Sequence, residues 1–269
     1  MAMKKRPDSV LQCLIYLTAA LLVVSAASLG ARVVTANAPA DAYPELYAFN
    51  EHGCIQPEQK TVYFTFDDGP SKNTEKLLDM LIEEEVKATF FVCAQAEDKE
   101  YSAKLLRRMR DEGHTIALHT YSHKYQDTYT SLESYLEDLS KIDSFIFEAT
   151  GQHAGLLRFP GGSATVNCDK ALMRRIADEV TRRGYIFYDW TVPSGDDTAH
   201  PKDVEELVRC IMGGIKDRQL EIVLCHDNAT PTTTPEAVRQ CIGLLREQGY
   251  AFDRLTPQVE PVQLVYEKK

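Results

Sequence analysis

Two short stretches of the sequence carry side chains of the types that bind metal ions. Asp67 and Asp68 stand together in TFDDGP, at the end of the β-branched and aromatic run 61–66. His119 and His123 follow another apolar run, and we expect a helical turn to place both imidazoles on one side. Each stretch alone also fits an ordinary turn or surface. Together they supply the two-histidine, one-carboxylate set that holds catalytic zinc and related metals and leaves positions open for water.

Three further stretches place polar side chains directly after apolar runs. Arg158 lies in RFPGG, Asp189 precedes Trp190, and His226 lies in LCHD. Each is a weak signal alone, because a surface cation, a helix cap and a buried histidine are common. In (β/α) barrels, however, functional side chains gather at the carboxyl ends of several strands, whereas a doubly wound sheet concentrates them at one switch point. The five stretches follow five different predicted strands and therefore favour a barrel.

The elements that must position these residues alternate along the chain. Apolar and β-branched runs predict strands, and apolar residues at helical spacing predict helices. The predicted strands are 61–66, 88–93, 115–118, 156–159, 185–190, 221–225 and 251–255. The predicted helices are 73–84, 101–111, 131–150, 169–183, 202–216 and 235–248. Alternation of this kind implies a parallel sheet with right-handed crossovers, so we expect an α/β fold, a distorted (β/α) barrel with about seven parallel strands.

The N-terminal region differs from the rest of the chain. Lys4, Lys5 and Arg6 precede the stretch 11–29, which contains no charged residue. This stretch is long enough to span a membrane and longer than the about 7 to 15 apolar residues of an ordinary signal peptide, which favours a retained transmembrane anchor over a cleaved signal helix. The preceding basic residues keep the N-terminus in the cytoplasm. We predict an anchor or signal segment at 1–32, a stalk at 33–59, a folded domain at 60–256 and a tail at 257–269.

Charge excludes one class of partner, whereas the cysteines decide little. A formal net charge of -10 argues against nucleic acid, because the average surface field repels a polyanion. Cys13 lies in the apolar N-terminal stretch, and Cys93 and Cys225 lie in predicted strands, where we expect small buried hydrophobes. The remaining cysteines are disulfide candidates with no assigned pairing: Cys54, Cys168, Cys210 and Cys241.

The five stretches, taken in order, resemble the motifs of a known family, the polysaccharide deacetylases of carbohydrate esterase family four, which share the NodB homology domain. The matching motifs are TFDDG at 65–69, HTYSH at 119–123, RFPGG at 158–162, DW at 189–190 and LCH at 224–226. The resemblance covers residues 60–256, and the ordered set is far more specific than any one motif.

The resemblance implies a metal centre and a base. Asp68, His119 and His123 would hold one divalent metal ion, with zinc expected and cobalt or manganese as alternatives. Asp67 would be the general base that takes a proton from the attacking water. Arg158 would orient and tune Asp67.

The resemblance also implies an acid and a binding pocket. His226 would be the general acid, paired with Asp189, and Trp190 with Leu224 would wall the pocket that receives the acetyl methyl group. Gly161 would offer its backbone N–H to the oxyanion. The family often has an aromatic residue at that position, so we expect the glycine to keep the N–H and to lose the ring that meets the sugar.

The implied activity is metal-dependent hydrolysis of N-acetyl groups from the amino sugars of a polysaccharide, with release of acetate. Peptidoglycan is the expected substrate, because a stalk of roughly 30 residues reaches up to about 100 Å and so contacts wall polymer beside the membrane. Chitin-like oligomers, an exopolysaccharide and a non-catalytic glycan-binding module of the same fold are the alternatives. A metal phosphoesterase is disfavoured, because it would need a second metal or several cations to bind phosphate.

We expect an extracytoplasmic monomer anchored to the membrane by its N-terminal helix, or secreted if the leader is cleaved.

Overall fold

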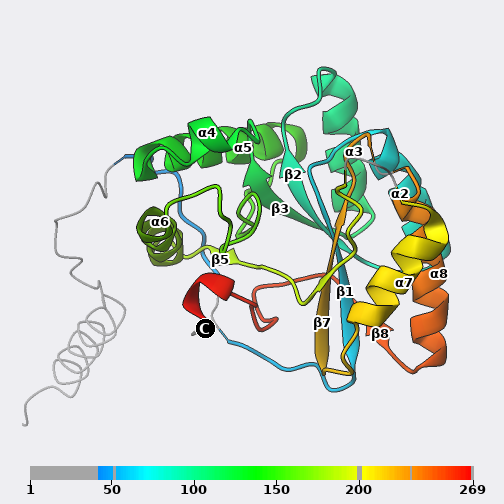
Figure 1. The fold of residues 1–269 in the computed structure, drawn as a ribbon. Coiled ribbons are helices and arrows are strands. Elements are labelled where there is room, and N and C mark those ends of the chain that lie inside the picture. Colours follow the sequence, from blue (N-terminus) through cyan, green and yellow to red (C-terminus); the bar gives the residue numbers. More distant parts are fainter. Residues whose placement is uncertain (1–41, 51–52, 199–201, 231, 268–269) are drawn as a thin grey trace, which may run out of the picture. The chain divides into compact units, whose positions relative to one another are not determined.

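The structure is a computed structural model that describes residues 42–50, 53–198, 202–230 and 232–267 (Figure 1). The predicted anchor or signal segment at 1–32 and the first part of the predicted stalk lie outside these residues. No helix within the described ranges is long and apolar enough to cross a membrane.

One parallel sheet forms the centre of the described domain. Its strands are β1 (Thr61–Asp67), β2 (Thr89–Cys93), β3 (Thr115–Thr120), β4 (Leu156–Leu157), β5 (Ile186–Phe187), β6 (Val192–Pro193), β7 (Leu220–His226) and β8 (Ala251–Phe252). The strands follow the order β5-β4-β3-β2-β1-β7-β6, and β8 pairs with the start of β1 (Figure 1). Every pairing between them is parallel. The predicted parallel (β/α) architecture is therefore confirmed.

The sheet is open between β5 and β6, although these two strands are neighbours along the chain. No ladder joins them among the described residues, so the chain at 188–191 crosses from one edge of the sheet to the other. Part of the C-terminal segment lies in the gap, where the Asp189 N–H donates to the Val262 carbonyl at 2.8 Å. The single strand predicted at 185–190 is wrong for this reason: β5 ends at Phe187, and the unpredicted β6 begins only after the crossing.

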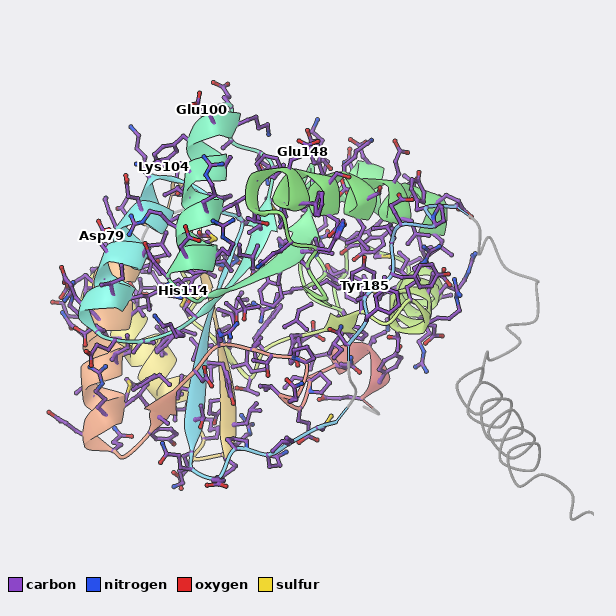
Figure 2. All side chains as sticks on the ribbon, turned by 180° about the vertical axis from the view of Figure 1, so that it is seen from behind. Asp79, Glu100, Lys104, His114, Glu148 and Tyr185 are labelled. Carbon is purple, nitrogen blue, oxygen red and sulfur yellow. The ribbon has the colours of Figure 1, made fainter. Side chains whose placement is uncertain are left out.

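Six helices confirm the predicted ones within a few residues at each end. They are α2 (Lys72–Glu83), α3 (Lys99–Asp111), α5 (Leu132–Thr150), α6 (Lys170–Arg182), α7 (Val204–Gly214) and α8 (Thr234–Glu247). Two shorter elements were not predicted: α4 (Tyr125–Thr128) and the 3-10 helix η1 (Leu264–Tyr266). At the start of five of these six helices a side chain accepts hydrogen bonds from otherwise unpaired N–H groups, as Ser71 does for α2 and Asp169 for α6. Charged residues such as Asp79 on α2 and Lys104 on α3 face outward (Figure 2).

The alternation of side chains along β1 separates two hydrophobic clusters. Val62, Phe64 and Phe66 pack in the larger cluster, together with residues of the helices. Tyr63 belongs to the smaller cluster, which is formed by alternate residues of the other strands and by C-terminal residues. Because successive side chains of a strand point to opposite faces, Asp67 shares the face of Tyr63. The strand thus delivers a carboxylate to the inner side of the sheet, at its carboxyl end.

The described part of the expected stalk packs on the domain. Arg183, which is 1% exposed, donates hydrogen bonds to the carbonyls of Ala42, Tyr43 and Leu46. Leu46 is fully buried, and Ile55 bonds through its N–H to the Gln258 carbonyl at 2.8 Å. Most of the expected stalk and tail therefore belongs to the folded unit.

The four disulfide candidates are unpaired. Cys168 and Cys241 are buried in the larger hydrophobic cluster, where they behave as small apolar residues. Cys54 is exposed and Cys210 half-buried. None of the four candidates therefore forms a disulfide in the described domain.

Because the segment at 42–50 packs on the domain, two substitutions within it should change the free energy of unfolding by different amounts. Leu46→Ala removes a fully buried side chain and is expected to lower the free energy of unfolding by about 2–5 kcal/mol. Phe49→Ala, at a residue that is 99% exposed, is the matched control and should change it by less than about 0.5 kcal/mol. Urea denaturation measures both, and equally small effects would contradict the docking.

Candidate active site

A cavity of about 410 Å³ opens at the carboxyl ends of β1, β3 and β7. Its lining includes eight of the ten predicted site residues: Asp67, Asp68, His119, His123, Gly161, Trp190, Leu224 and His226. Parallel pairing explains the convergence, because Asp67 at the end of β1 lies opposite His226 at the end of β7. The other two predicted residues, Arg158 and Asp189, are not part of this lining: Arg158 donates to Asp67 of the lining, whereas Asp189 accepts from Ser163 outside it.

Both predicted histidines point at one carboxylate oxygen. The Oδ1 atom of Asp68 lies 3.4 Å from Nε2 of His119 and 3.1 Å from Nε2 of His123. Nδ1 of His119 lies 2.8 Å from the Arg158 carbonyl, which only accepts, so Nδ1 carries the proton and the Nε2 lone pair faces the cavity. Burial would raise the pKa of Asp68, but the two histidines, which in their protonated form donate from Nε2 to its carboxylate, hold that pKa well below its usual range.

These atoms fit a metal ion. Two ligands at about 2.0–2.2 Å from one ion in a tetrahedral arrangement lie about 3.4 Å apart. The separations from Asp68 to the two histidines, 3.1 and 3.4 Å, are close to this value, whereas the ligand atoms that all lie within 4.8 Å of one another are those of Asp68, Cys93 and His119. The donor set of one carboxylate and two imidazoles suits zinc and related divalent metals.

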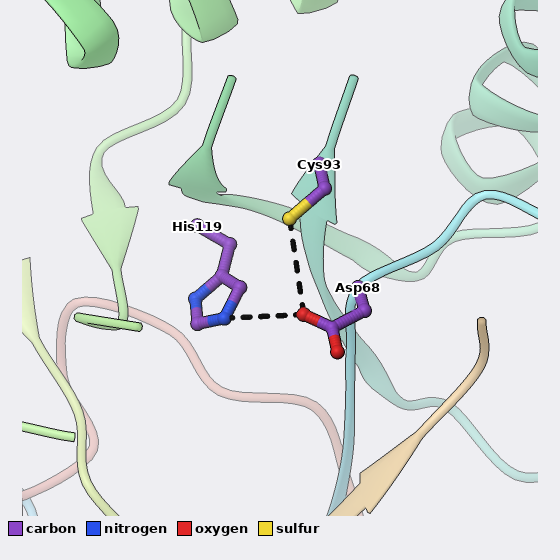
Figure 3. Close-up of side chains that lie close together, drawn as sticks. All are labelled: Asp68, Cys93 and His119. Atoms are coloured by element: carbon purple, nitrogen blue, oxygen red, sulfur yellow. Dashed lines mark hydrogen bonds and ion pairs between the residues drawn. The ribbon is translucent and has the colours of Figure 1, made fainter. Parts of the chain in front are cut away.

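Cys93 is a further group at this position, and its place there was not predicted. Its Sγ lies 3.8 Å from Oδ1 of Asp68, and the ligand atoms of Asp68, Cys93 and His119 lie within 4.8 Å of one another (Figure 3). Burial raises the pKa of the Cys93 thiol well above its ordinary value, and the nearby carboxylates raise it further. Both effects favour the neutral thiol, which can donate to the Asp68 carboxylate.

The helical turn expected between the histidines is wrong. His119 lies within β3, and His123 follows in a bend with a φ of 51°. The bend is held by Asp138 of α5, which accepts hydrogen bonds from the N–H of Tyr121 at 2.6 Å and of Ser122 at 3.2 Å. Asp138 was missed because its role depends on a contact between segments far apart in the sequence.

The predicted contact between Arg158 and Asp67 is present. Nη1 of Arg158 donates to Oδ1 of Asp67 at 2.8 Å and to Oγ1 of Thr65 at 2.8 Å. The same guanidinium donates to the carbonyls of Tyr188 and Asp189, at 2.9 and 3.1 Å. Because Oδ1 of Asp67 is occupied in this way, Oδ2 is the oxygen left to face the cavity.

His226 pairs with Asp196, and the expected pairing with Asp189 is not formed. Nδ1 of His226 donates to Oδ1 of Asp196 at 2.8 Å, and the His226 N–H donates to Oδ2 at 2.9 Å. The carboxylate of Asp189 instead accepts from Ser163 and from the Leu264 N–H. The physical reason is the crossing at 188–191, which carries Asp189 behind the cavity, whereas β6 pairs with β7 and brings Asp196 beside His226. The acidic pair that Asp196 forms with Asp197 was the available sequence signal.

The partner of His226 changes its proton affinity. Burial alone would lower the pKa of His226, but the hydrogen bond and the negative charge of Asp196 outweigh burial and raise that pKa to about 9. The imidazole is therefore protonated near neutrality. It can donate from Nε2 while Asp196 holds Nδ1.

Hydrogen bonds to Asp227 stabilise the loop that carries Asp68, the carboxylate that faces the metal site. It accepts hydrogen bonds from the Gly69 N–H at 2.7 Å and from the Thr74 hydroxyl at 2.5 Å, and its own N–H donates to the Asp67 carbonyl at 2.9 Å. Burial raises the pKa of Asp227 to about 7, against the opposing effect of these bonds. A Cβ at Gly69 would collide with the Asp227 carboxylate, which explains the glycine. Asp227 follows His226 in LCHD and was not predicted.

Measurement of metal affinity distinguishes a histidine ligand from the neighbouring cysteine. His123→Ala is expected to weaken binding of zinc or cobalt by about 100-fold or more, since it removes a ligand rather than a supporting group. Cys93→Ala is the control and should change the affinity by less than about tenfold, because the thiol is neutral. Isothermal titration calorimetry measures both. A loss for Cys93→Ala as large as that for His123→Ala would show that the cysteine is a ligand.

The titration of His226 identifies its partner. A histidine whose folded pKa is raised from 6.5 to about 9 stabilises the fold below pH 6.5, and this contribution is lost as the pH rises through about 9. Asp196→Asn should bring the pKa of His226 back toward or below 6.5, whereas Asp189→Asn should leave it unchanged. NMR titration of the imidazole, with chelator present, measures the difference. The opposite pattern would restore the pairing expected from the sequence.

Comparison with known proteins agrees with the geometry. The family model for polysaccharide deacetylase matches residues 55–176. A putative polysaccharide deacetylase of Bacillus subtilis is 31% identical over 207 residues, which are 76% of this chain and 70% of that protein. A peptidoglycan-N-acetylglucosamine deacetylase of Bacillus cereus is 30% identical over 199 residues, 73% of this chain and 69% of that protein.

A solved structure extends the similarity to three dimensions. The crystal structure of the catalytic domain of the peptidoglycan N-acetylglucosamine deacetylase from Eubacterium rectale is similar with a TM-score of 0.73 and 36% sequence identity. The match covers 79% of this chain and 96% of that domain. The chain belongs to the polysaccharide deacetylase family.

Proposed function

We propose that this chain is a metal-dependent enzyme that removes N-acetyl groups from the amino sugars of peptidoglycan. The observation that carries the proposal is the placement of a carboxylate and a protonated imidazole, Asp67 and His226, as partners on neighbouring strands beside the metal-facing Asp68. Hydrolysis of an amide needs a base for the water and an acid for the departing amine, and the cavity lining contains both.

The metal centre consists of Asp68, His119 and His123, and zinc is the ion that we propose for it. When bound, the ion supplies Lewis-acid chemistry, since it polarises the amide carbonyl and lowers the pKa of water. The Arg158 carbonyl fixes the proton of His119 on Nδ1, so that this ligand is ready without a change of tautomer.

Asp67 acts as the general base. Arg158 and the end of β1 fix the orientation of its carboxylate, and Oδ2 accepts the proton of the attacking water. The neighbouring Asp68 cannot share this role, because both histidines converge on its Oδ1. Two adjacent carboxylates therefore perform two different tasks.

His226 acts as the general acid. Asp196 holds Nδ1 and keeps the imidazole protonated, so that Nε2 donates its proton to the nitrogen of the departing amino sugar. Asp196 is therefore the carboxylate partner of His226, the role that was predicted for Asp189 from the sequence. The products are acetate and a free amine on the sugar.

The remaining lining residues bind the substrate. The backbone N–H of Gly161 stabilises the oxyanion. Trp190 and Leu224 form the apolar wall for the acetyl methyl group. Two of the relatives carry peptidoglycan N-acetylglucosamine deacetylase in their names, which supports peptidoglycan as the polymer. We further propose an extracytoplasmic monomer, held at the membrane by residues 1–32.

Release of acetate tests the proposal. The protein is incubated with peptidoglycan, acetylated chitooligosaccharides and an acetylated exopolysaccharide, and mass spectrometry measures the loss of acetyl groups. We expect loss from peptidoglycan, abolition by chelator and restoration by zinc. If binding to a glycan persists but no metal restores release from any of them, the chain is a glycan-binding module and the proposal fails.

A substitution of the base tests the mechanism. Asp67→Asn should lower kcat by about 10²–10⁴-fold, because the amide cannot accept the proton. Metal affinity should stay near that of the unchanged protein, since Asp67 is not a ligand. Asp79→Asn on the exposed face of α2 is the control and should leave kcat unchanged. Unchanged activity of Asp67→Asn would overturn the assignment of the base.

A further inference from the structure

One wall of the cavity comes from a residue outside all five motifs. Tyr125, the first residue of α4, lines the cavity two positions after His123. Its ring packs edge-on against the His123 ring, with centroids 5.4 Å apart and an interplanar angle of 68°. Its other ring neighbour is Tyr129, at 6.1 Å. Tyr125 is therefore held in place from one side, while another side faces the cavity.

The hydroxyl of Tyr125 reaches the turn that contains Gly161. A Cβ built on Gly161 would lie 3.3 Å from the Tyr125 hydroxyl and 2.7 Å from Oγ1 of Thr165. Gly161 has a φ of 75°, a conformation that side chains rarely adopt. The glycine therefore both permits the turn and leaves the room that the tyrosine occupies.

This hydroxyl is free to bind a ligand. Within the part of the chain that the structure describes, it forms no hydrogen bond to another residue. By contrast, the hydroxyl of the neighbouring Tyr129 donates to the Pro160 carbonyl at 3.0 Å. A phenol that lines a polar cavity without a protein partner offers one donor and a ring face to an occupant.

Gly161 led to the expectation that this wall lacks an aromatic ring. Tyr125 lines the same cavity from a different segment, with its hydroxyl beside Gly161. This placement could not be predicted from the sequence, because Tyr125 and Gly161 lie on different segments and α4 is too short to show a period.

We propose that Tyr125 binds the amino sugar in the cavity, with its ring against the sugar and its hydroxyl donating a hydrogen bond to a sugar oxygen beside Gly161. The ligand class is therefore an N-acetylated pyranose of a glycan chain. The inference rests on the proposed function for the identity of the ligand. It assigns Tyr125 to ground-state binding, which distinguishes it from the acid and the base.

Two substitutions separate the ring from the hydroxyl. Tyr125→Phe keeps the ring and should raise KM by about 3- to 30-fold with kcat nearly unchanged, as expected for the loss of one hydrogen bond made equally in the ground and transition states. Tyr125→Ala should raise KM further. Tyr266→Phe is the matched control, because its hydroxyl bonds to Asp178 and it does not line this cavity.

Binding without turnover keeps this test independent of the catalytic proposal. In the Asp67→Asn background and with zinc bound, calorimetry measures the Kd of N-acetylglucosamine pentamer and of a disaccharide muropeptide. Adding Tyr125→Phe should weaken binding of at least one glycan by a factor similar to the rise in KM, whether or not the parent chain releases acetate.

Three outcomes would overturn the inference. The first is unchanged glycan affinity in Tyr125→Phe and Tyr125→Ala. The second is a fall of kcat at constant KM, which would make the hydroxyl a transition-state donor. The third is a loss of zinc affinity in Tyr125→Ala as large as that of His123→Ala, which would reduce Tyr125 to a support for the histidine.

Discussion

A fully buried guanidinium, that of Arg158, is the group on which the rest of the site depends. Its four hydrogen bonds join Thr65 and Asp67 of β1 to the carbonyls of residues 188 and 189. Burying either charge alone would cost several kcal/mol, and only the pairing with good hydrogen bonds offsets it. The same bonds orient the base and connect β1 to the crossing chain, so folding and the proposed catalysis share one interaction.

The carboxylates in the cavity lining and behind it meet their surroundings differently: Asp67, Asp68 and Asp196 line the cavity, as Asp197 does, and Asp227 lies outside the lining. Asp67 is balanced by Arg158, Asp68 faces two histidines and Asp196 faces one. No cationic side chain among the described residues pairs with Asp227, and burial raises its pKa to about 7. Repulsion between like charges, together with different surroundings, moves the pKa values of neighbouring carboxyl groups apart. Neighbouring carboxylates can therefore perform different tasks. The excess negative charge left around Asp68 is what a divalent ion would neutralise.

The sequence predicted whatever depends on local pattern, and it missed whatever depends on tertiary contacts. Strands in apolar runs and the six main helices were found because burial leaves an apolar pattern, whereas β6 is Val192–Pro193 in a polar stretch that shows none. The partner of His226 was misassigned because only the path of the chain across the sheet decides between Asp189 and Asp196. Leu46 was missed in the same way, as a single buried leucine within a Pro- and Gly-rich stretch.

The crossing at 188–191 has a consequence for how such a site diversifies. In a closed barrel the diameter is set by strand number and register, so a change of width disturbs every ladder. Here two edges of the sheet are linked by a covalent span, packed against the C-terminal segment. Because the carbonyls of residues 188 and 189 accept hydrogen bonds from Arg158, a change in the length of that span would also disturb the group that orients Asp67. The closure of the sheet and the orientation of the proposed base are thus coupled through one short segment.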